Sequence, residues 1–286
     1  ETNGDEKRTT DYYNYNFPLS GATMTFFRTT QEVLQDRVVR QALVRAVDKP
    51  AILSTLGYPV KALDGPLLRT HPGYDAKYAQ STGRPKEAMQ LLDKAGWKPG
   101  ADGIRTKGDQ RLSFRLFSES NAEYAAVSQE LQKQWREVGA DVEVLLQSDI
   151  DLQSTIAFHT YDALLYGIEI GPEPDVFPYW HSSQADVRSP NRLNFSEYES
   201  AAADASLIAG RTRADAKLQA IKYAPFVRAW QADAPALALY QPRFLYVVQS
   251  KIPALNSHTL TSGTERYANV YDWQVRRAPV DNPSFR

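Results

Sequence analysis

"LSFRLFSESNAEYAAVSQELQKQWREVGADVEVLLQ", residues 112–147, contains a strand pattern, a helix pattern and a second strand pattern in direct succession. Its first segment alternates apolar and polar residues, as a half-buried strand does. From Asn121 to Gly139 apolar residues recur at i+3 and i+4 spacing, which predicts an amphipathic helix, and "ADVEVLLQ" follows as a strand. Because parallel strands need a helical crossover, this order predicts an α/β fold with a partly parallel sheet.

The flanking segments carry further strand and helix patterns. Residues 34–53, "LQDRVVRQALVRAVDKPAIL", predict a helix that Asp48 and Pro50 divide, because Asp caps a helix start and Pro suits its first turn. Residues 59–83 lack periodicity and predict an extended surface loop. The other predicted elements are a strand at 21–29, helices at 84–97, 195–209 and 212–232, a hairpin around 107–109, and strands at 236–240 and 244–249.

Composition excludes several functional classes. The 286 residues carry 33 basic and 34 acidic side chains, so no field of one sign would attract nucleic acid. The absence of cysteine excludes disulfides and thiolate chemistry, and no apolar run approaches the ~20 residues that span a bilayer. The four histidines are scattered and no nucleotide-binding or nucleophile motif occurs, so we predict no catalytic residue, metal site or cofactor.

One loop has the features expected of a ligand site. "YDALLYGIEIGPEPDVFPYW", residues 161–180, places a buried strand before a proline-stiffened segment rich in carboxylates and aromatic rings. Ligands of open α/β sheets bind outside the carboxyl ends of strands. The candidate ligand contacts are Tyr166, Glu169, Ile170, Gly171, Glu173, Asp175, Tyr179 and Trp180. An alternative role for Glu173 and Asp175 is to cap a short helix that begins near Val176.

Five segments, in order, resemble the family-5 extracellular solute-binding proteins of ABC transporters, the peptide- and nickel-binding group. They are "LQDRVVRQALVRAVDKPAIL", "RPKEAMQLLDKAGW", "AAVSQELQKQWREVGADVEV", "YDALLYGIEIGPEPDVF" and "DAPALALY". The resemblance implies an α/β lobe of the periplasmic-binding-protein type II kind, with a mixed sheet flanked by helices. It also implies that residues 1–22 are a partial N-terminal lobe and hinge segment, 23–273 the C-terminal lobe and 274–286 a tail, with the rest of the N-terminal lobe missing.

The resemblance further implies a function. It predicts the substrate-binding component of an ABC importer, which captures an oligopeptide or similar small solute by closure of two lobes and delivers it to a permease. Such a protein is extracytoplasmic, either periplasmic or lipid-anchored at the cell surface, makes no covalent change and has no nucleic-acid partner. The alternatives are a hydrolase that uses Glu169, Glu173 and Asp175, and a docking module that uses the helices within 195–232.

The resemblance leaves the ligand open. In peptide-binding members an aspartate of the 161–180 loop pairs with the peptide α-amine, and its position falls on Ile170 here, beside Glu169. Neighbouring strand residues point to opposite faces, so Glu169 replaces that aspartate only if the chain is bulged or shifted. An oligosaccharide or a modified peptide is therefore a further ligand class.

Overall fold

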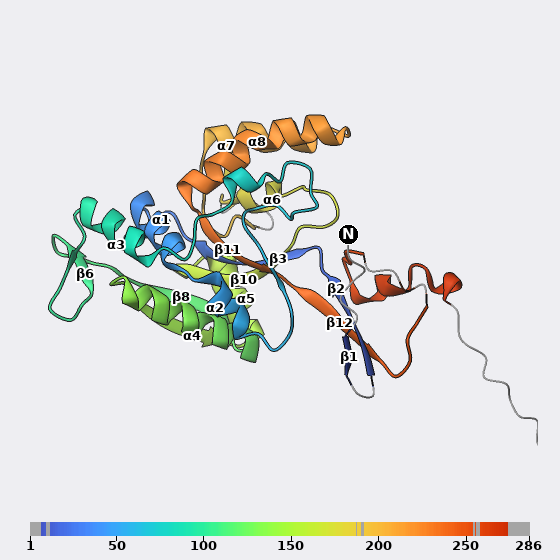
Figure 1. The fold of residues 1–286 in the computed structure, drawn as a ribbon. Coiled ribbons are helices and arrows are strands. Elements are labelled where there is room, and N and C mark those ends of the chain that lie inside the picture. The colour runs from blue at the N-terminus through green and yellow to red at the C-terminus, as the bar shows by residue number, and fades with distance from the viewer. Residues whose placement is uncertain are drawn as a thin grey trace, which may run out of the picture. The chain divides into compact units, whose positions relative to one another are not determined.

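The computed structural model describes residues 7–9, 12–186, 188–189, 192–253, 255 and 258–273, and the chain forms two compact units (Figure 1). One unit is Gly21–Pro242, and the other combines the residues up to Ser20 with those from Arg243 onward. These limits differ from the predicted boundaries after residues 22 and 273, because the segment from Arg243 groups with the first strands of the chain. The predicted tail, 274–286, lies outside the described residues. No helix among the described residues is long and apolar enough to cross a membrane.

A six-stranded mixed sheet forms the centre of the larger unit, in the order β4-β11-β3-β10-β8-β9. Strands β8 and β9 run parallel, and so do β8 and β10, which confirms the predicted parallel pairing. Strand β3 runs antiparallel to β10 and β11, so the carboxyl ends of β8, β9, β10 and β11 share one edge of the sheet. The strands are β3 (Gly21–Phe27), β4 (Lys61–Ala62), β8 (Ser113–Glu119), β9 (Asp141–Gln147), β10 (Ala163–Glu169) and β11 (Ala236–Gln241).

Helices cover both faces of this sheet and enclose a hydrophobic core on each side. One face carries α1 (Arg37–Ala46), α2 (Lys49–Ser54), α3 (Pro85–Lys94) and α4 (Ala122–Glu137). The other carries α5 (Asp149–Phe158), α6 (Phe177–Trp180), α7 (Ala201–Arg211) and α8 (Ala216–Asp233). Asp48 caps α2 through the backbone N–H of Ala51, as its position predicts. The predicted hairpin is also confirmed, as β6 (Arg105–Lys107) and β7 (Gln110–Arg111) beside β5 (Lys98–Pro99).

Two sequence predictions about this unit are wrong, and one helix was not predicted. The helix predicted from residue 195 begins at Ala201, because Glu197 adopts a left-handed conformation with φ 48° that no helix accommodates. The connection 59–83 is not a surface loop throughout, since Leu63, Leu67 and Leu68 are buried in the core. Helix α5 has no counterpart in the prediction, although Ser148 accepts a hydrogen bond from the N–H of Asp151 as its N-cap.

The smaller unit contains a three-stranded antiparallel sheet in the order β1-β2-β12. Its strands are β1 (Lys7–Thr9), β2 (Tyr12–Pro18) and β12 (Arg243–Val248). Tyr15, Phe17 and Leu260 form its small core, and the N–H of Ser20 donates to the carbonyl of Leu260 at 2.8 Å. Both predicted closing strands exist, as β11 and β12, but they belong to different sheets.

Candidate functional site

The carboxyl edge of the six-stranded sheet carries most of the candidate ligand contacts. Strand β10 ends at Glu169, which pairs with Gly21, and the register along β10 and β3 contains no bulge. Beyond it Gly171 has φ 81°, a conformation that favours glycine, and its carbonyl accepts from Nε2 of His71 at 3.0 Å. Burial lowers the pKa of His71, so its imidazole is a neutral donor that fixes the loop.

Tyr166, Glu169 and Tyr179 are brought together at this edge. The hydroxyl of Tyr179 donates to the backbone carbonyl of Glu169 at 2.6 Å, and that of Tyr166 accepts from Gln153 at 3.1 Å. Both tyrosine rings lie beside Phe195, with centroid distances of 5.7 and 6.3 Å. The carboxylate of Glu169 is exposed and has no hydrogen bond or ion pair to any described residue. This edge therefore presents a free negative charge on the α4 face of the sheet and two partly buried rings on the α6 face.

Ile170 and Trp180 lie in the core instead. Ile170 is 7% exposed and Trp180 is 0% exposed. The indole of Trp180 stacks on Phe26 at 5.6 Å and meets the edge of Trp230 at 5.5 Å between ring centroids. Neither side chain offers a surface to a ligand in this structure, because both belong to the hydrophobic core between the sheet and the helices on this face. Aromatic contact at this edge is therefore left to Tyr166 and Tyr179.

Asp175 has a structural partner, whereas the side chain of Glu173 has no hydrogen bond or ion pair to any residue that the structure describes. The carboxylate of Asp175 pairs with Arg211 at 2.7 Å and accepts from the N–H of Phe177 at 3.3 Å, where α6 begins. The guanidinium of Arg211 also lies over the ring of Phe177, 4.3 Å from its centroid. This agrees with the capping role for Asp175, while Glu173 is exposed beside it.

The sequence interpretation missed a tyrosine-rich cluster at the same edge. Glu123, in the first turn of α4, accepts from the hydroxyl of Tyr58 at 2.8 Å and from that of Tyr240 at 2.6 Å. Beside it, the hydroxyl of Tyr124 lies 2.8 Å from where a Cβ on Gly167 would stand, so a larger residue there would displace the Tyr124 hydroxyl. A glycine inside a strand pattern signals such a close approach, and this was the signal available in the sequence.

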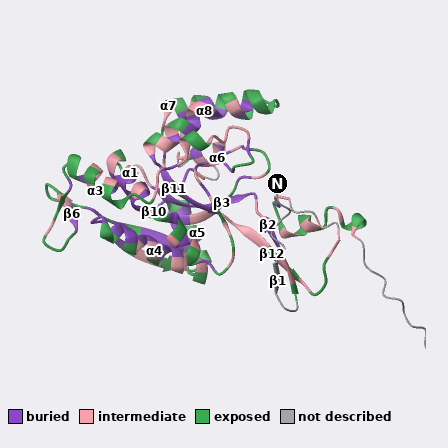
Figure 2. Ribbon diagram, viewed as in Figure 1, coloured by how far each residue is buried: buried purple, intermediate pink, exposed green. Residues whose placement is uncertain are grey.

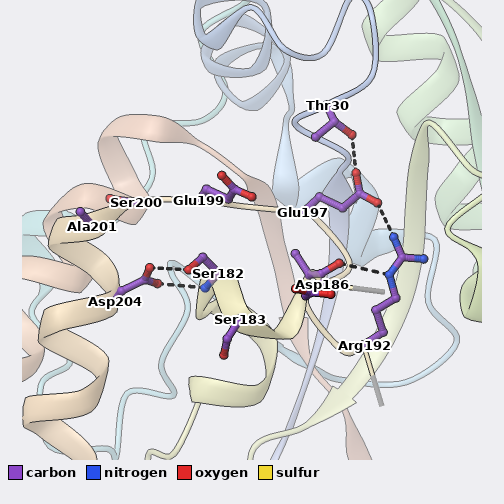
Figure 3. Close-up of a pocket in the computed structure, with 11 residues that line it drawn as sticks. Thr30, Ser182, Ser183, Asp186, Arg192, Glu197, Glu199, Ser200, Ala201 and Asp204 are labelled. Carbon is purple, nitrogen blue, oxygen red and sulfur yellow. Dashed lines mark hydrogen bonds and ion pairs between the residues drawn. The ribbon is translucent and has the colours of Figure 1, made fainter. Parts of the chain in front are cut away.

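A cavity of about 690 Å³ lies at the opposite edge of the sheet, where β3 ends and β10 begins (Figure 3). Hydroxyl and carboxylate groups dominate its lining. The lining residues are Thr30, Ser182, Ser183, Ala185, Asp186, Arg192, Glu197, Glu199, Ser200, Ala201 and Asp204. None of the residues predicted as ligand contacts lines this cavity.

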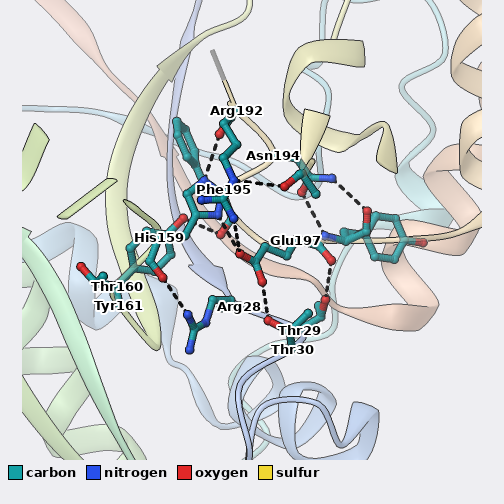
Figure 4. Close-up of polar contacts among 12 residues, drawn as sticks. Arg28, Thr29, Thr30, His159, Thr160, Tyr161, Arg192, Asn194, Phe195 and Glu197 are labelled. Atoms are coloured by element: carbon teal, nitrogen blue, oxygen red, sulfur yellow. Dashed lines mark hydrogen bonds and ion pairs between the residues drawn. The ribbon is translucent and has the colours of Figure 1, made fainter. Parts of the chain in front are cut away.

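A polar network supports one wall of this cavity (Figure 4). Glu197 accepts from Nδ1 of His159 at 3.0 Å, from Arg192 at 3.1 Å and from the hydroxyl of Thr30. Nε2 of His159 lies 3.0 Å from the backbone carbonyl of Arg192. His159, Arg192 and Glu197 all adopt left-handed backbone conformations, with φ of 48°, 47° and 48°. Side-chain bonds thus hold together three backbone conformations that are individually unfavourable for these residue types.

This network predicts that acid weakens the fold. Burial raises the pKa of Glu197, but hydrogen bonds from His159 and Thr30 outweigh it and leave the pKa below its ordinary 4.5. A carboxyl with a lowered folded-state pKa stabilises the fold above its unfolded-state value, and that stability is lost as pH falls through the folded value. We expect the urea midpoint to fall between about pH 5 and pH 3 and to fall less in Glu197→Gln. The control Glu173→Gln should show the same dependence of the urea midpoint on pH as the parent chain. The same dependence in the parent chain, Glu197→Gln and Glu173→Gln would contradict this role of Glu197.

Comparison with known proteins gives a consistent family signal. Residues 2–189 match the family model described as "Bacterial extracellular solute-binding proteins, family 5 Middle". Protein XP55 of Streptomyces lividans is 30% identical over 242 residues, which are 79% of this chain and 41% of that protein. The oligopeptide-binding protein AppA of Bacillus subtilis is 28% identical over 219 residues, 74% of this chain and 39% of AppA. The chain thus spans about two fifths of the length of these relatives.

Solved structures share the fold. NikZ from Campylobacter jejuni, in complex with Ni(L-His), superposes with a TM-score of 0.80 at 24% identity over 94% of this chain and 54% of NikZ. AppA from Bacillus subtilis, in complex with a nonapeptide, gives a TM-score of 0.77 at 22% identity over 93% of this chain and 53% of AppA. The fold is therefore that of type II periplasmic binding proteins, as the sequence predicted.

Proposed function

Because the chain belongs to the bacterial extracellular solute-binding proteins of family 5, we propose that it is part of the substrate-binding component of an ABC importer. In this proposal it works outside the cytoplasm, captures an oligopeptide or similar small solute by closure of two lobes, and delivers it to a membrane permease. The unit Gly21–Pro242 would be the C-terminal lobe, and the smaller unit would contribute to the N-terminal lobe and hinge. Family members are solute-binding proteins, so we propose binding without a chemical reaction.

The free carboxylate of Glu169 at the carboxyl edge of the sheet is the observation that carries this proposal. Open α/β sheets bind ligands outside the carboxyl ends of their strands, which is where β8, β9, β10 and β11 end together. A carboxylate without a protein partner is available for a charge-assisted hydrogen bond to a cationic ligand group, such as a peptide amine. Tyr166 and Tyr179 supply aromatic surface at the same edge, on the other face of the sheet.

The straight register of β10 limits how Glu169 can serve. Since no bulge intervenes, its side chain points to the face opposite Ile168 and Ile170, toward α4 and not toward α6. Glu169 therefore does not stand in for the family aspartate by occupying the same face. We propose that it contacts the ligand from the face of the sheet that also carries Glu123.

The hydrolase alternative is less well supported by the geometry. Of the three carboxylates considered for it, Asp175 is bound to Arg211 and to the start of α6. An acid and base pair needs carboxylates that remain free to exchange protons with a substrate. The relatives in the comparison that bear a functional name are binding proteins, which favours the transport role.

The ligand class is tested most directly on the full-length gene product. Gentle purification from its own cells, followed by native mass spectrometry, should detect a bound small molecule that is released on denaturation. A released peptide would support the proposal, a sugar would retain solute capture but replace the peptide class, and measurable hydrolysis of the released compound would contradict it.

Substitution of Glu169 tests its contact with the ligand. Removing a charge-assisted hydrogen bond costs about 1.5–3 kcal/mol, so Glu169→Gln should weaken binding of a cationic ligand at least about tenfold. Isothermal titration of the full-length protein with the ligand recovered from it measures this change. Glu173→Gln, which alters an exposed carboxylate of the same loop, serves as the matched control. Equal affinities for both variants and the parent protein would exclude the contact.

A further inference from the structure

The hairpin between α7 and α8 forms an exposed tip, which we define as residues 208–222. All eight residues from 211 to 218 are exposed, and Figure 2 shows the first turns of α8 coloured as exposed. The cavity of Figure 3 includes none of these residues. The tip is thus an exposed surface separate from that cavity.

Large aliphatic side chains stand on this tip. Ile208 is 50% exposed, Leu218 is 49% exposed and Ile221 is 64% exposed. Ile221 is not part of the buried face of α8, which is made by residues that include Gln219, Tyr223 and Phe226. Leu218 and Ile221 are one helical turn apart and therefore share an outer face. Such side chains on a helix surface gain free energy when a partner removes them from water.

Cations surround these aliphatic residues. The tip carries Arg211, Arg213, Lys217 and Lys222 against a single acid, Asp215. Asp215 is engaged as the N-cap of α8, where it accepts from the N–H of Leu218 at 2.9 Å. Arg211 is paired with Asp175, whereas Arg213, Lys217 and Lys222 have no ion pair to any described residue. Three positive charges are therefore available to an anionic partner.

We propose that the α7–α8 tip is a contact surface for anionic phospholipid. Lys217 stands four residues before Ile221, and Lys222 stands four residues after Leu218, so each aliphatic side chain has a cation as its i,i+4 neighbour on the surface of α8. This pairing suits the boundary where phosphate headgroups meet acyl chains. An exposed tip with long, flexible cations requires no fixed arrangement of partner charges, which favours a fluid lipid surface over a structured acidic protein.

The proposal goes beyond solute capture, because it concerns association of the protein with a membrane surface and not the solute that it captures. Each Lys or Arg near an anionic surface contributes about fivefold to partition, so the three unpaired cations account for about a hundredfold. A contact of this strength is reversible, and it would raise the local concentration of the protein at the membrane without holding it there permanently.

Vesicle sedimentation with the full chain tests the proposal. The chain should sediment with vesicles of phosphatidylglycerol and phosphatidylcholine in equal parts, remain in solution with phosphatidylcholine alone, and be released as salt is raised. Lys217→Glu with Lys222→Glu should lower partition at least about a hundredfold, because each change removes an attractive charge and adds a repulsive one. Leu218→Ser with Ile221→Ser keeps every charge and should lower partition about tenfold or more through lost apolar burial.

A matched control separates the tip from net charge. Lys86→Glu with Lys94→Glu makes the same charge change on exposed positions of α3 in the same unit, and it should leave partition within about threefold of the parent chain. Far-ultraviolet circular dichroism confirms that each variant is folded. Absence of binding to the anionic vesicles, equal binding to both vesicle types, or an equal loss in the α3 control would each overturn the proposal.

Discussion

Arg40→Ala is expected to lower the free energy of unfolding by about 3–5 kcal/mol. Arg40 is 5% exposed and lies within α1, in the stretch 34–53. Its Nη1 donates to the carbonyls of Leu34 and Gln35 at 2.6 and 3.1 Å. Its Nε and Nη2 donate to the carbonyl of Asp233 at 3.1 and 2.8 Å. Alanine would leave these buried or partly buried acceptors without their donor, and each loss costs about 1–3 kcal/mol where water cannot replace it.

Lysine is not expected to rescue this position. Burial lowers the pKa of Arg40 to about 10, so it stays charged at neutral pH, and its planar fork reaches three carbonyls that one ammonium group cannot serve together. Arg45→Ala is the control on the same helix, because that side chain is partly exposed and pairs with Glu87 at 2.9 Å, a contact worth about 1 kcal/mol or less. Urea denaturation of the three variants measures the difference, and an Arg40→Ala chain no less stable than Arg45→Ala would contradict this account.

The contacts of Arg40 explain the basic residue within the apolar helix pattern. They join the entry of α1 to the last turn of α8, next to Ala234, whose φ of 48° ends that helix. One side chain thereby holds α1 against α8, through two residues, Arg40 and Asp233, that are 193 positions apart in the sequence. The role is structural, and it places no positive charge at the candidate ligand site.

Trp180→Ala should also cost about 3–5 kcal/mol, because it removes a fully buried indole and leaves a cavity. The ring fills the space between Phe26 on β3 and Trp230 on α8. Trp180→Phe keeps an aromatic ring against Phe26 and should cost less, about 1–2 kcal/mol. Urea denaturation again provides the measurement.

The two Trp180 variants also distinguish a core residue from a ligand contact. If Trp180 touched ligand, Trp180→Phe would weaken binding while Trp180→Ala left stability nearly unchanged. We expect the opposite result. Trp180→Ala should lower the free energy of unfolding, and Trp180→Phe should have little effect on the affinity for ligand. Tyr179→Phe provides the contrast, since it removes only the partly exposed hydroxyl that donates to the carbonyl of Glu169.

Part of the candidate site was accessible from sequence. The loop that follows β10 was identified because a buried strand ends there in prolines, carboxylates and rings, and Tyr166, Glu169 and Tyr179 do lie together at that edge. The same pattern gave no means of separating Tyr179 from Trp180. The ring of Trp180 enters the core because it packs against Trp230 of α8, some 50 residues later in the chain. The local sequence around residue 180 does not contain that contact.

The sequence by itself determined the strands and helices around residues 112–147, the parallel pairing of β8 with β9, the cap of α2 and the family, because each depends on local periodicity or short motifs. Only the tertiary structure decided the burial of Ile170 and Trp180, the Tyr58–Glu123–Tyr240 cluster and the network of His159, Arg192 and Glu197. It also decided that β11 and β12, adjacent in sequence, belong to separate sheets. These features arise from contacts between residues far apart in the chain, whose energies outweigh local preferences and leave no periodic trace in the sequence.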